Sequence, residues 1–194
     1  MYMNDEDIKK YPDLYHYLKG HFPSFPKRKP KIFKVWLDVA VDGRANETGV
    51  GDDSFPRYVF EWGQGPNVSV NTYMMPTTCI PVTNPPTIQP DGSFIREQVI
   101  PWYGFTVPTK GKDEIYVAED LAKGAMSQQI NHVLEVTVLH ELIHWCQREI
   151  GRDVYSEEAP YRFEKLAYGK TTLRSWAACK SLKYYAGRIE EVSN

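Results

Sequence analysis

The chain has 194 residues, a formal net charge of −2 and a sequence pI near 6.2. This length suits one domain with a substantial core, and we expect residues 1–194 to form a single domain. The small net charge gives no indication of nucleic-acid binding. The basic residues between Lys27 and Lys31 are interrupted by proline, which favours a solvated loop over a binding patch.

The sequence indicates neither membrane insertion nor secretion through a cleaved leader. No apolar run approaches the ~18 residues that a membrane span needs, and the polar N-terminal segment is unlike a signal peptide. We therefore expect synthesis in the cytoplasm without a signal peptide, and export, if any, by another route. Of the three cysteines, Cys146 and Cys179 could pair in an oxidising compartment, but the odd count favours buried thiols.

Apolar and turn-forming residues predict the elements of the first half of the chain. We expect a helix over residues 5–20, in which Pro12 marks the first turn or a kink. Strands should follow over residues 32–41, 57–62 and 67–74, the last two as a hairpin around GQGP. Half of the 14 prolines lie between Pro76 and Pro108. The apolar residues among them predict an ordered, extended segment that packs on the domain and could form one wall of a cleft.

The second half of the chain is predicted to be mostly helical. The expected elements are a strand over 114–118, a short helix over 119–126, a central helix from Asn131 to Gly151, a helix from about Ser156 to Gly169, and a last helix from Thr171 or Thr172 to about residue 185. The strands thus gather before the helices. This order predicts an α+β fold with a small N-terminal sheet and a helical C-terminal half.

The central helix contains His140, Glu141 and His144, which together form the motif HExxH. Residues four apart lie on the same face of a helix, so the two imidazoles can bind one metal ion, and two nitrogens at this spacing suit zinc. Glu141 lies on the edge of that face, where it can reach an activated water as a general base. The alternative is a pair of core histidines that bond to backbone or carboxylate groups, because the segment is apolar on most faces.

A catalytic zinc site needs a third protein ligand and an open position for water. No histidine follows His144, and the longer pattern HExxHxxGxxH fails because Gln147 and Ile150 occupy its last two named positions. The candidates for the third ligand are therefore acidic: Asp153, Glu157, Glu158 and Glu164.

Two resemblances bear on this choice. Glu164 stands 20 residues after His144, a spacing similar to that of thermolysin-like enzymes, whose third ligand is a glutamate on a following helix. A closer resemblance, to the zincin-like metallopeptidase toxin domain called metallopeptidase toxin 3, lies in HELIHW at 140–145, FEKLAYG at 163–169 and IYVAEDL at 115–121. It covers the last 80 residues or so. It implies a zincin-like fold, zinc bound by the two histidines and a later glutamate, and a toxic effector with a cognate immunity protein.

Motif and resemblance together predict a zinc-dependent, gluzincin-like metallopeptidase that acts on a protein or peptide. We expect His140, His144 and Glu164 to bind Zn²⁺, and Glu141 to act as the general base. An extended substrate would pair with the strand over 115–118 by edge addition. The candidates for the group that stabilises the developing oxyanion are Tyr161, Tyr168, Tyr184, Tyr185 and Arg174, with Tyr168 first because it follows Glu164 by one helical turn.

The resemblance further implies an antibacterial effector that is delivered into the periplasm or cytoplasm of a target cell. One version of this domain is the C-terminal extension of a type VI secretion spike protein, so a spike protein is a second expected partner. Two alternatives stay open at the level of sequence. One is a catalytically inactive, zinc-stabilised binding module whose site is closed by a fourth ligand such as Glu157 or Cys146. The other is a housekeeping peptidase without a toxin role.

Overall fold

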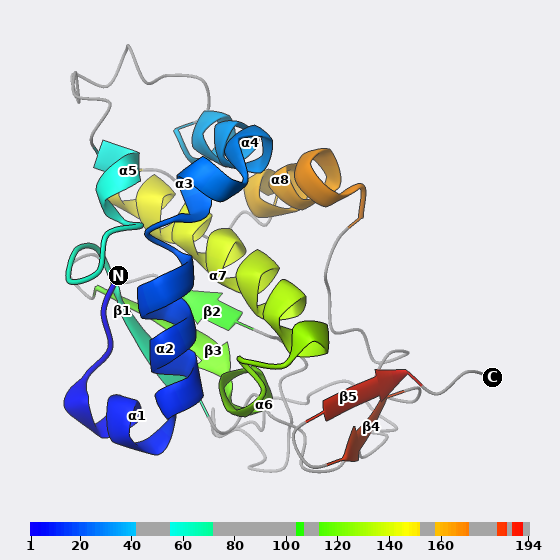
Figure 1. Ribbon diagram of the computed structural model, residues 1–194. Coiled ribbons are helices and arrows are strands. Elements are labelled where there is room, and N and C mark those ends of the chain that lie inside the picture. The colour runs from blue at the N-terminus through cyan, green and yellow to red at the C-terminus, as the bar shows by residue number, and fades with distance from the viewer. Residues whose placement is uncertain are drawn as a thin grey trace, which may run out of the picture.

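A computed structural model of the protein describes residues 1–41, 55–71, 104–106, 113–151, 158–170, 182–185 and 188–191. Figure 1 shows the elements in chain order. They are α1 (Asp5–Lys10), α2 (Pro12–His21), α3 (Phe25–Arg28), α4 (Pro30–Ala40), α5 (Phe55–Tyr58), β1 (Asn67–Asn71), β2 (Gly104–Thr106), β3 (Glu114–Ala118), α6 (Glu119–Lys123), α7 (Gln128–Glu149), α8 (Glu158–Tyr168), β4 (Leu182–Tyr185) and β5 (Arg188–Glu191). This mixture of helices and small sheets is compatible with the predicted α+β class. The predicted N-terminal position of the sheet is wrong, because helices α1 to α5 precede β1 and a two-stranded sheet follows α8.

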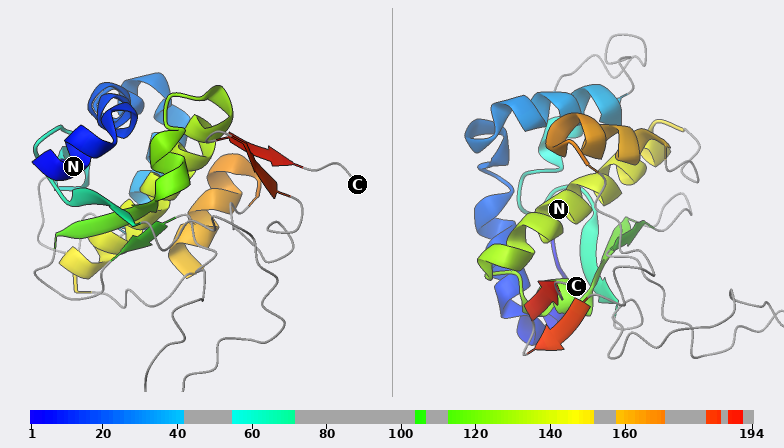
Figure 2. Two further views of the ribbon diagram at one scale, coloured as in Figure 1. Left: turned by 90° about the horizontal axis from the view of Figure 1, so that it is seen from below. Right: turned by 90° about the vertical axis from the view of Figure 1, so that its right-hand side faces the viewer.

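Helix α7, 22 residues long, lies in the middle of the fold. It contacts strands β2 and β3 on one side and helices α4 and α8 on the other, and both views in Figure 2 show α8 packed beside it. Its burial explains why so much of its sequence is apolar: a helix covered on several sides needs no polar face. The HExxH motif therefore sits on the most enclosed helix of the described chain.

A three-stranded sheet has the order β1-β3-β2. Strand β1 pairs parallel with β3, with Val68 opposite Ile115, whereas β2 pairs antiparallel, with Thr106 also opposite Ile115. The strand predicted over 114–118 is confirmed. The strand predicted over 67–74 is confirmed for residues 67–71, and residues 72–74 lie outside the described part of the chain. Because β3 has a neighbour on each side, it offers no open edge, so the expectation that a substrate would pair with residues 115–118 is wrong.

The predicted strand over residues 32–41 is wrong, because the structure has helix α4 there. The prediction followed the many β-branched and aromatic residues and overlooked their spacing. Phe33, Trp36 and Ala40 are three and four residues apart, and all are buried on one helical face. Pro30 at the first position of the helix is a typical start signal.

Two other expectations about regular structure also fail. Residues 57–62 form the end of α5 and a turn, so there is no hairpin with β1; Gly63 and Gly65 adopt positive φ in the GQGP loop instead. The last helix was expected to reach about residue 185, but residues 182–185 form β4, which pairs antiparallel with β5. Residues 171–181, where that helix would begin, lie outside the described part of the chain.

The remaining boundaries agree well with the sequence. The first helix divides at Pro12, which occupies the first turn of α2. Helix α7 begins at Gln128, three residues before the expected start at Asn131, and Ser127 is its N-cap. Gly151 and Gly169, at φ of 77° and 76°, follow α7 and α8 in the left-handed conformation that glycine adopts readily.

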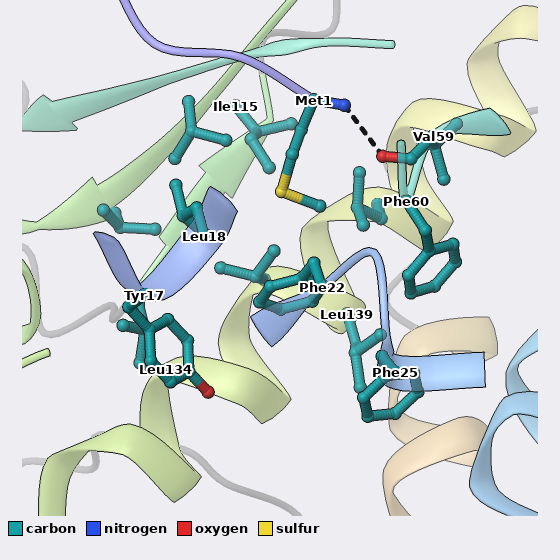
Figure 3. Close-up of a cluster of buried hydrophobic side chains, with 14 of the residues drawn as sticks. Met1, Tyr17, Leu18, Phe22, Phe25, Val59, Phe60, Ile115, Leu134 and Leu139 are labelled. Atoms are coloured by element: carbon teal, nitrogen blue, oxygen red, sulfur yellow. Dashed lines mark hydrogen bonds between the residues drawn. The ribbon is translucent and has the colours of Figure 1, made fainter. Parts of the chain in front are cut away.

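An aromatic cluster anchors the N-terminal helices to α7. Figure 3 shows Phe22, Phe25 and Phe60 close to Leu139 of α7, and the rings of Phe25 and Phe60 stack with centroids 5.7 Å apart. The Trp36 indole lies edge-on to Phe60, with centroids 4.8 Å apart, and its N–H donates to the Leu139 carbonyl at 2.9 Å. This core fixes α7 in the turn immediately before the HExxH motif.

Candidate metal centre

The two histidines of the motif lie one above the other on α7. Their ring centroids are 5.1 Å apart, and the planes are inclined by 64°. His144 is buried, with 4% exposure, and the His140 side chain is 12% exposed. The spacing of four residues thus brings the two imidazoles together as the sequence predicted.

Glu164 comes from α8 and reaches His140. Its Oε1 lies 2.6 Å from His140 Nδ1, and the carboxylate is 2% exposed. The Tyr161 ring, on the same face of α8, lies 5.4 Å from the His140 ring, centroid to centroid. The structure therefore brings two of the three predicted ligands into direct contact. Of the rival carboxylates, Asp153 and Glu157 lie outside the described residues, and nothing is described of the Glu158 side chain.

Glu141 points toward the sheet and is 5% exposed. The Thr106 hydroxyl, on β2, lies 2.6 Å from Glu141 Oε2 and donates a hydrogen bond to it. The backbone of Gly104, also on β2, lies so close that a Cβ there would be 2.7 Å from Glu141 Oε1. No sequence pattern predicts this contact, because β2 lies in the proline-rich segment and Thr106 is 35 residues from Glu141.

A second buried carboxylate, Glu135, docks α8 onto α7. Its Oε1 accepts hydrogen bonds from Lys29 Nζ at 2.6 Å and from the Tyr168 hydroxyl at 3.0 Å, and its Oε2 lies 2.8 Å from His21 Nε2. Burial alone would raise the pKa of Glu135, but the bonds from His21, Lys29 and Tyr168 outweigh it and lower the pKa to about 2. The charged Glu135 side chain therefore links α7 to α2, to the residue before α4 and to α8. This role was not predicted from the sequence.

These contacts revise two roles considered from the sequence. Tyr168, ranked first as oxyanion donor, gives its hydroxyl to Glu135, and burial raises its pKa. Cys146, considered as a fourth ligand, is fully buried in the apolar core two residues after His144, on a different face of α7. Burial also raises the pKa of the Cys146 thiol, which disfavours the thiolate that a metal requires. Arg174 lies outside the described residues, as do the side chains of Tyr184 and Tyr185.

The chemistry of these side chains fits a metal ion. Two imidazoles lie side by side, and a carboxylate contacts one of them in a nearly solvent-free setting. Donors of these types suit a divalent transition metal. Among the described residues, no group of three histidine, cysteine or acidic side chains is arranged closely enough to hold a metal ion as it stands. The contact to Nδ1 is also the contact by which a carboxylate commonly orients a metal-binding histidine.

A buried helix that presents two imidazoles and a glutamate, with a second carboxylate supplied by the next helix, is the kind of site found in metal-dependent hydrolases. The family model for metallopeptidase toxin 3 matches residues 7–169, and the chain belongs to this family. The match therefore also covers much of the first half of the chain, beyond the last 80 residues or so in which the resemblance lies. No curated protein and no solved structure matches the chain. None of the described helices is long and apolar enough to cross a membrane.

Proposed function

We propose that this metallopeptidase uses zinc, held by His140, His144 and Glu164, to hydrolyse peptide bonds. The observation that carries the proposal is that two imidazoles lie together on one face of α7, with a buried carboxylate 2.6 Å from one of them. Bound zinc would supply Lewis acidity, which activates water and polarises the scissile carbonyl. Nitrogen and oxygen donors of this type favour zinc over the hard cations magnesium and calcium.

Glu141 is the general base of the proposed reaction. Its carboxylate takes a proton from the attacking water and passes it to the leaving amine, a transfer that contributes roughly 10²–10⁴-fold in rate. Its position next to His140 on α7 and its low exposure support this role. Tyr161 becomes the first candidate for the oxyanion donor, because its ring contacts His140 whereas the Tyr168 hydroxyl bonds to Glu135.

Glu164 can bind the metal directly or orient His140 toward it, and we propose that it binds the metal. A carboxylate beside His140 can bind the ion together with it, or it can accept a hydrogen bond from Nδ1 and leave Nε2 to the ion. Glu164→Gln separates the two roles, because its amide oxygen can still accept a bond from Nδ1 but is a poor replacement for a charged ligand. A ligand role predicts that Glu164→Gln loses zinc as Glu164→Ala does. An orienting role predicts that Glu164→Gln keeps most of its zinc affinity.

The first experiment is elemental analysis of the purified protein with a peptide-cleavage assay beside it. We expect about one zinc per chain in the wild type. Glu141→Ala should keep the zinc and lose cleavage, whereas Glu164→Ala should lose both. Glu149→Ala, an exposed site on the same helix, is the matched control and should change neither. If the wild type takes up no zinc, or if Glu141→Ala cleaves as well as the wild type, the proposed mechanism is wrong.

We further propose that the peptidase is an antibacterial effector, delivered to the periplasm or cytoplasm of a target cell and neutralised by an immunity protein. The support is membership of a family described as a metallopeptidase toxin. The test is expression in each compartment of a bacterial host. Growth should stop with the wild type and continue with Glu141→Ala, which lacks the base, provided that both proteins accumulate to the same level. Equal growth of the two strains would instead favour a housekeeping peptidase.

A further inference from the structure

Strand β2 contacts the motif helix at one side chain in particular, that of Glu141. The Thr106 hydroxyl lies 2.6 Å from Glu141 Oε2 and 3.0 Å from the Glu141 backbone carbonyl. A hydroxyl has one proton to donate, and the shorter contact to a carboxylate is the stronger hydrogen bond. Thr106 is itself buried, at 8% exposure, so water competes little for this bond.

Gly104 packs against the other carboxylate oxygen of Glu141, Oε1. A Cβ at this position would stand 2.7 Å from Glu141 Oε1 and 2.7 Å from the γ-methyl of Thr137. Real side chains do not tolerate such distances, so only glycine lets the strand come this close. The two carboxylate oxygens of Glu141 thus face two different residues of one short strand, one through a hydrogen bond and one through close backbone contact.

The position of β2 is set by backbone pairing rather than by its own side chains. Gly104 lies opposite Val117 and Thr106 opposite Ile115 in the ladder with β3. Both partners on β3 are fully buried in the core that supports α7. The hydroxyl of Thr106 is therefore held at a fixed place relative to α7, as a positioning group must be.

We propose that Thr106 is a positioning residue for the reaction: it anchors Oε2 of Glu141 and so orients the carboxylate for proton transfer. The inference rests on the proposed role of Glu141 as general base. Anchoring Oε2 holds the carboxylate in one orientation, and it removes a side-chain rotation that would otherwise precede each transfer. Gly104 contributes by leaving space for the carboxylate between the strand and the helix.

The kinetic test compares Thr106→Val with Thr106→Ser, on a fluorogenic peptide chosen from a library because the wild type cleaves it. Valine keeps the shape and removes the hydroxyl. We expect kcat to fall about 10–100-fold, as is common for such supporting contacts, while KM and zinc content stay near the wild-type values. Thr106→Ser restores the hydroxyl and should recover most of the lost rate. Thr137→Val makes the same change one turn before Glu141 and should leave kcat within about twofold.

A second measurement uses metal-free protein and needs no activity. Thr106→Val is introduced into the wild type and into Glu141→Ala, and the melting temperature of each is recorded. If Thr106 acts on the carboxylate, Thr106→Val lowers the melting temperature in the wild type and has a clearly smaller effect in Glu141→Ala. If its only role is to bond to the backbone carbonyl of the helix, the two shifts are equal.

The outcomes separate this inference from the proposed function. If the wild type holds zinc and cleaves peptide, but Thr106→Val is as fast as the wild type or the two thermal shifts are equal, the positioning role is wrong and the peptidase stands. If the wild type itself neither binds zinc nor cleaves, the proposed function fails, and the positioning role fails with it. A slow Thr106→Val, a recovered Thr106→Ser and unequal thermal shifts together support the role.

Discussion

The charge on Glu135 should be worth about 3 kcal/mol of folding free energy. Its pKa is about 2 in the fold, against an ordinary value of 4.5, a difference of about 2.5. Each pKa unit corresponds to about 1.4 kcal/mol, which gives roughly 3 kcal/mol. The carboxylate is only 2% exposed, so solvent does not screen its bonds to Lys29, His21 and Tyr168.

The pH range follows from the sign of this change. A lowered pKa means that the unfolded chain binds the proton more readily, so stability falls as the pH falls. The contribution is complete above about pH 4.5 and declines as the pH approaches 2. Glu135→Gln removes the charge at every pH. It should therefore be about 3 kcal/mol less stable than the wild type at pH 7, and the gap should close in acid.

The assay is urea unfolding of metal-free protein from pH 7 down to pH 2.5, so that acid loss of a metal does not contribute. Glu149→Gln is the matched control on the same helix. Its carboxylate is 30% exposed and pairs with Arg148 at 3.0 Å, so solvent screens it more than it screens Glu135, and its acid-dependent gap should be smaller. A gap between wild type and Glu135→Gln that stays constant from pH 7 to 2.5 would refute the reasoning, because it would come from packing rather than charge.

Three further predictions concern the packing of α7, the end of α8 and the metal. Trp36→Phe removes the N–H that satisfies the buried Leu139 carbonyl and should cost about 1–3 kcal/mol, measured by urea unfolding. Gly169→Ala places a Cβ at φ 76°, where space is open but the backbone is strained, and should cost about 1–2 kcal/mol by the same assay. Zinc at about a thousand times its dissociation constant should stabilise the wild type and Glu141→Ala by about 4 kcal/mol in thermal melts. The same zinc should not stabilise His140→Ala.

The sequence could predict those parts of the site whose geometry is local. His140 and His144 need only the pitch of one helix to meet, and a motif of adjacent residues carries that information. The ends of α7 and α8 were also local signals, because Gly151 and Gly169 follow these helices in the left-handed conformation that glycine adopts readily. Glu164 required more: spacing and family resemblance together indicated it, and the fold then brought it within 2.6 Å of His140.

The clearest error in the predicted secondary structure arose where the strand preference of the residues opposed the helical spacing of the apolar positions. The segment 32–41 has the composition of a strand and the spacing of a helix, and the spacing determined the structure because burial rewards one continuous apolar face. The sheet shows a second limit. Residues 67–71 and 114–118 were both recognised as strands, but nothing within either segment reveals that they pair parallel or that β2 occupies the other side of β3.

The contacts that support the candidate site join segments far apart in the chain. Thr106 and Glu141 are 35 residues apart, and Glu135 is 106 residues from Lys29 and 33 from Tyr168. The partners of the two carboxylates are a threonine, a lysine and a tyrosine. Residues of these types occur at many positions, so the sequence does not show which of them contacts a carboxylate. The HExxH motif places two imidazoles and Glu141 on one helix. Thr106 of β2 holds Glu141, and α8 brings Glu164 to His140. For this reason, variants at β2 test how the candidate base is oriented, whereas variants at Glu135 test how α8 is held against α7.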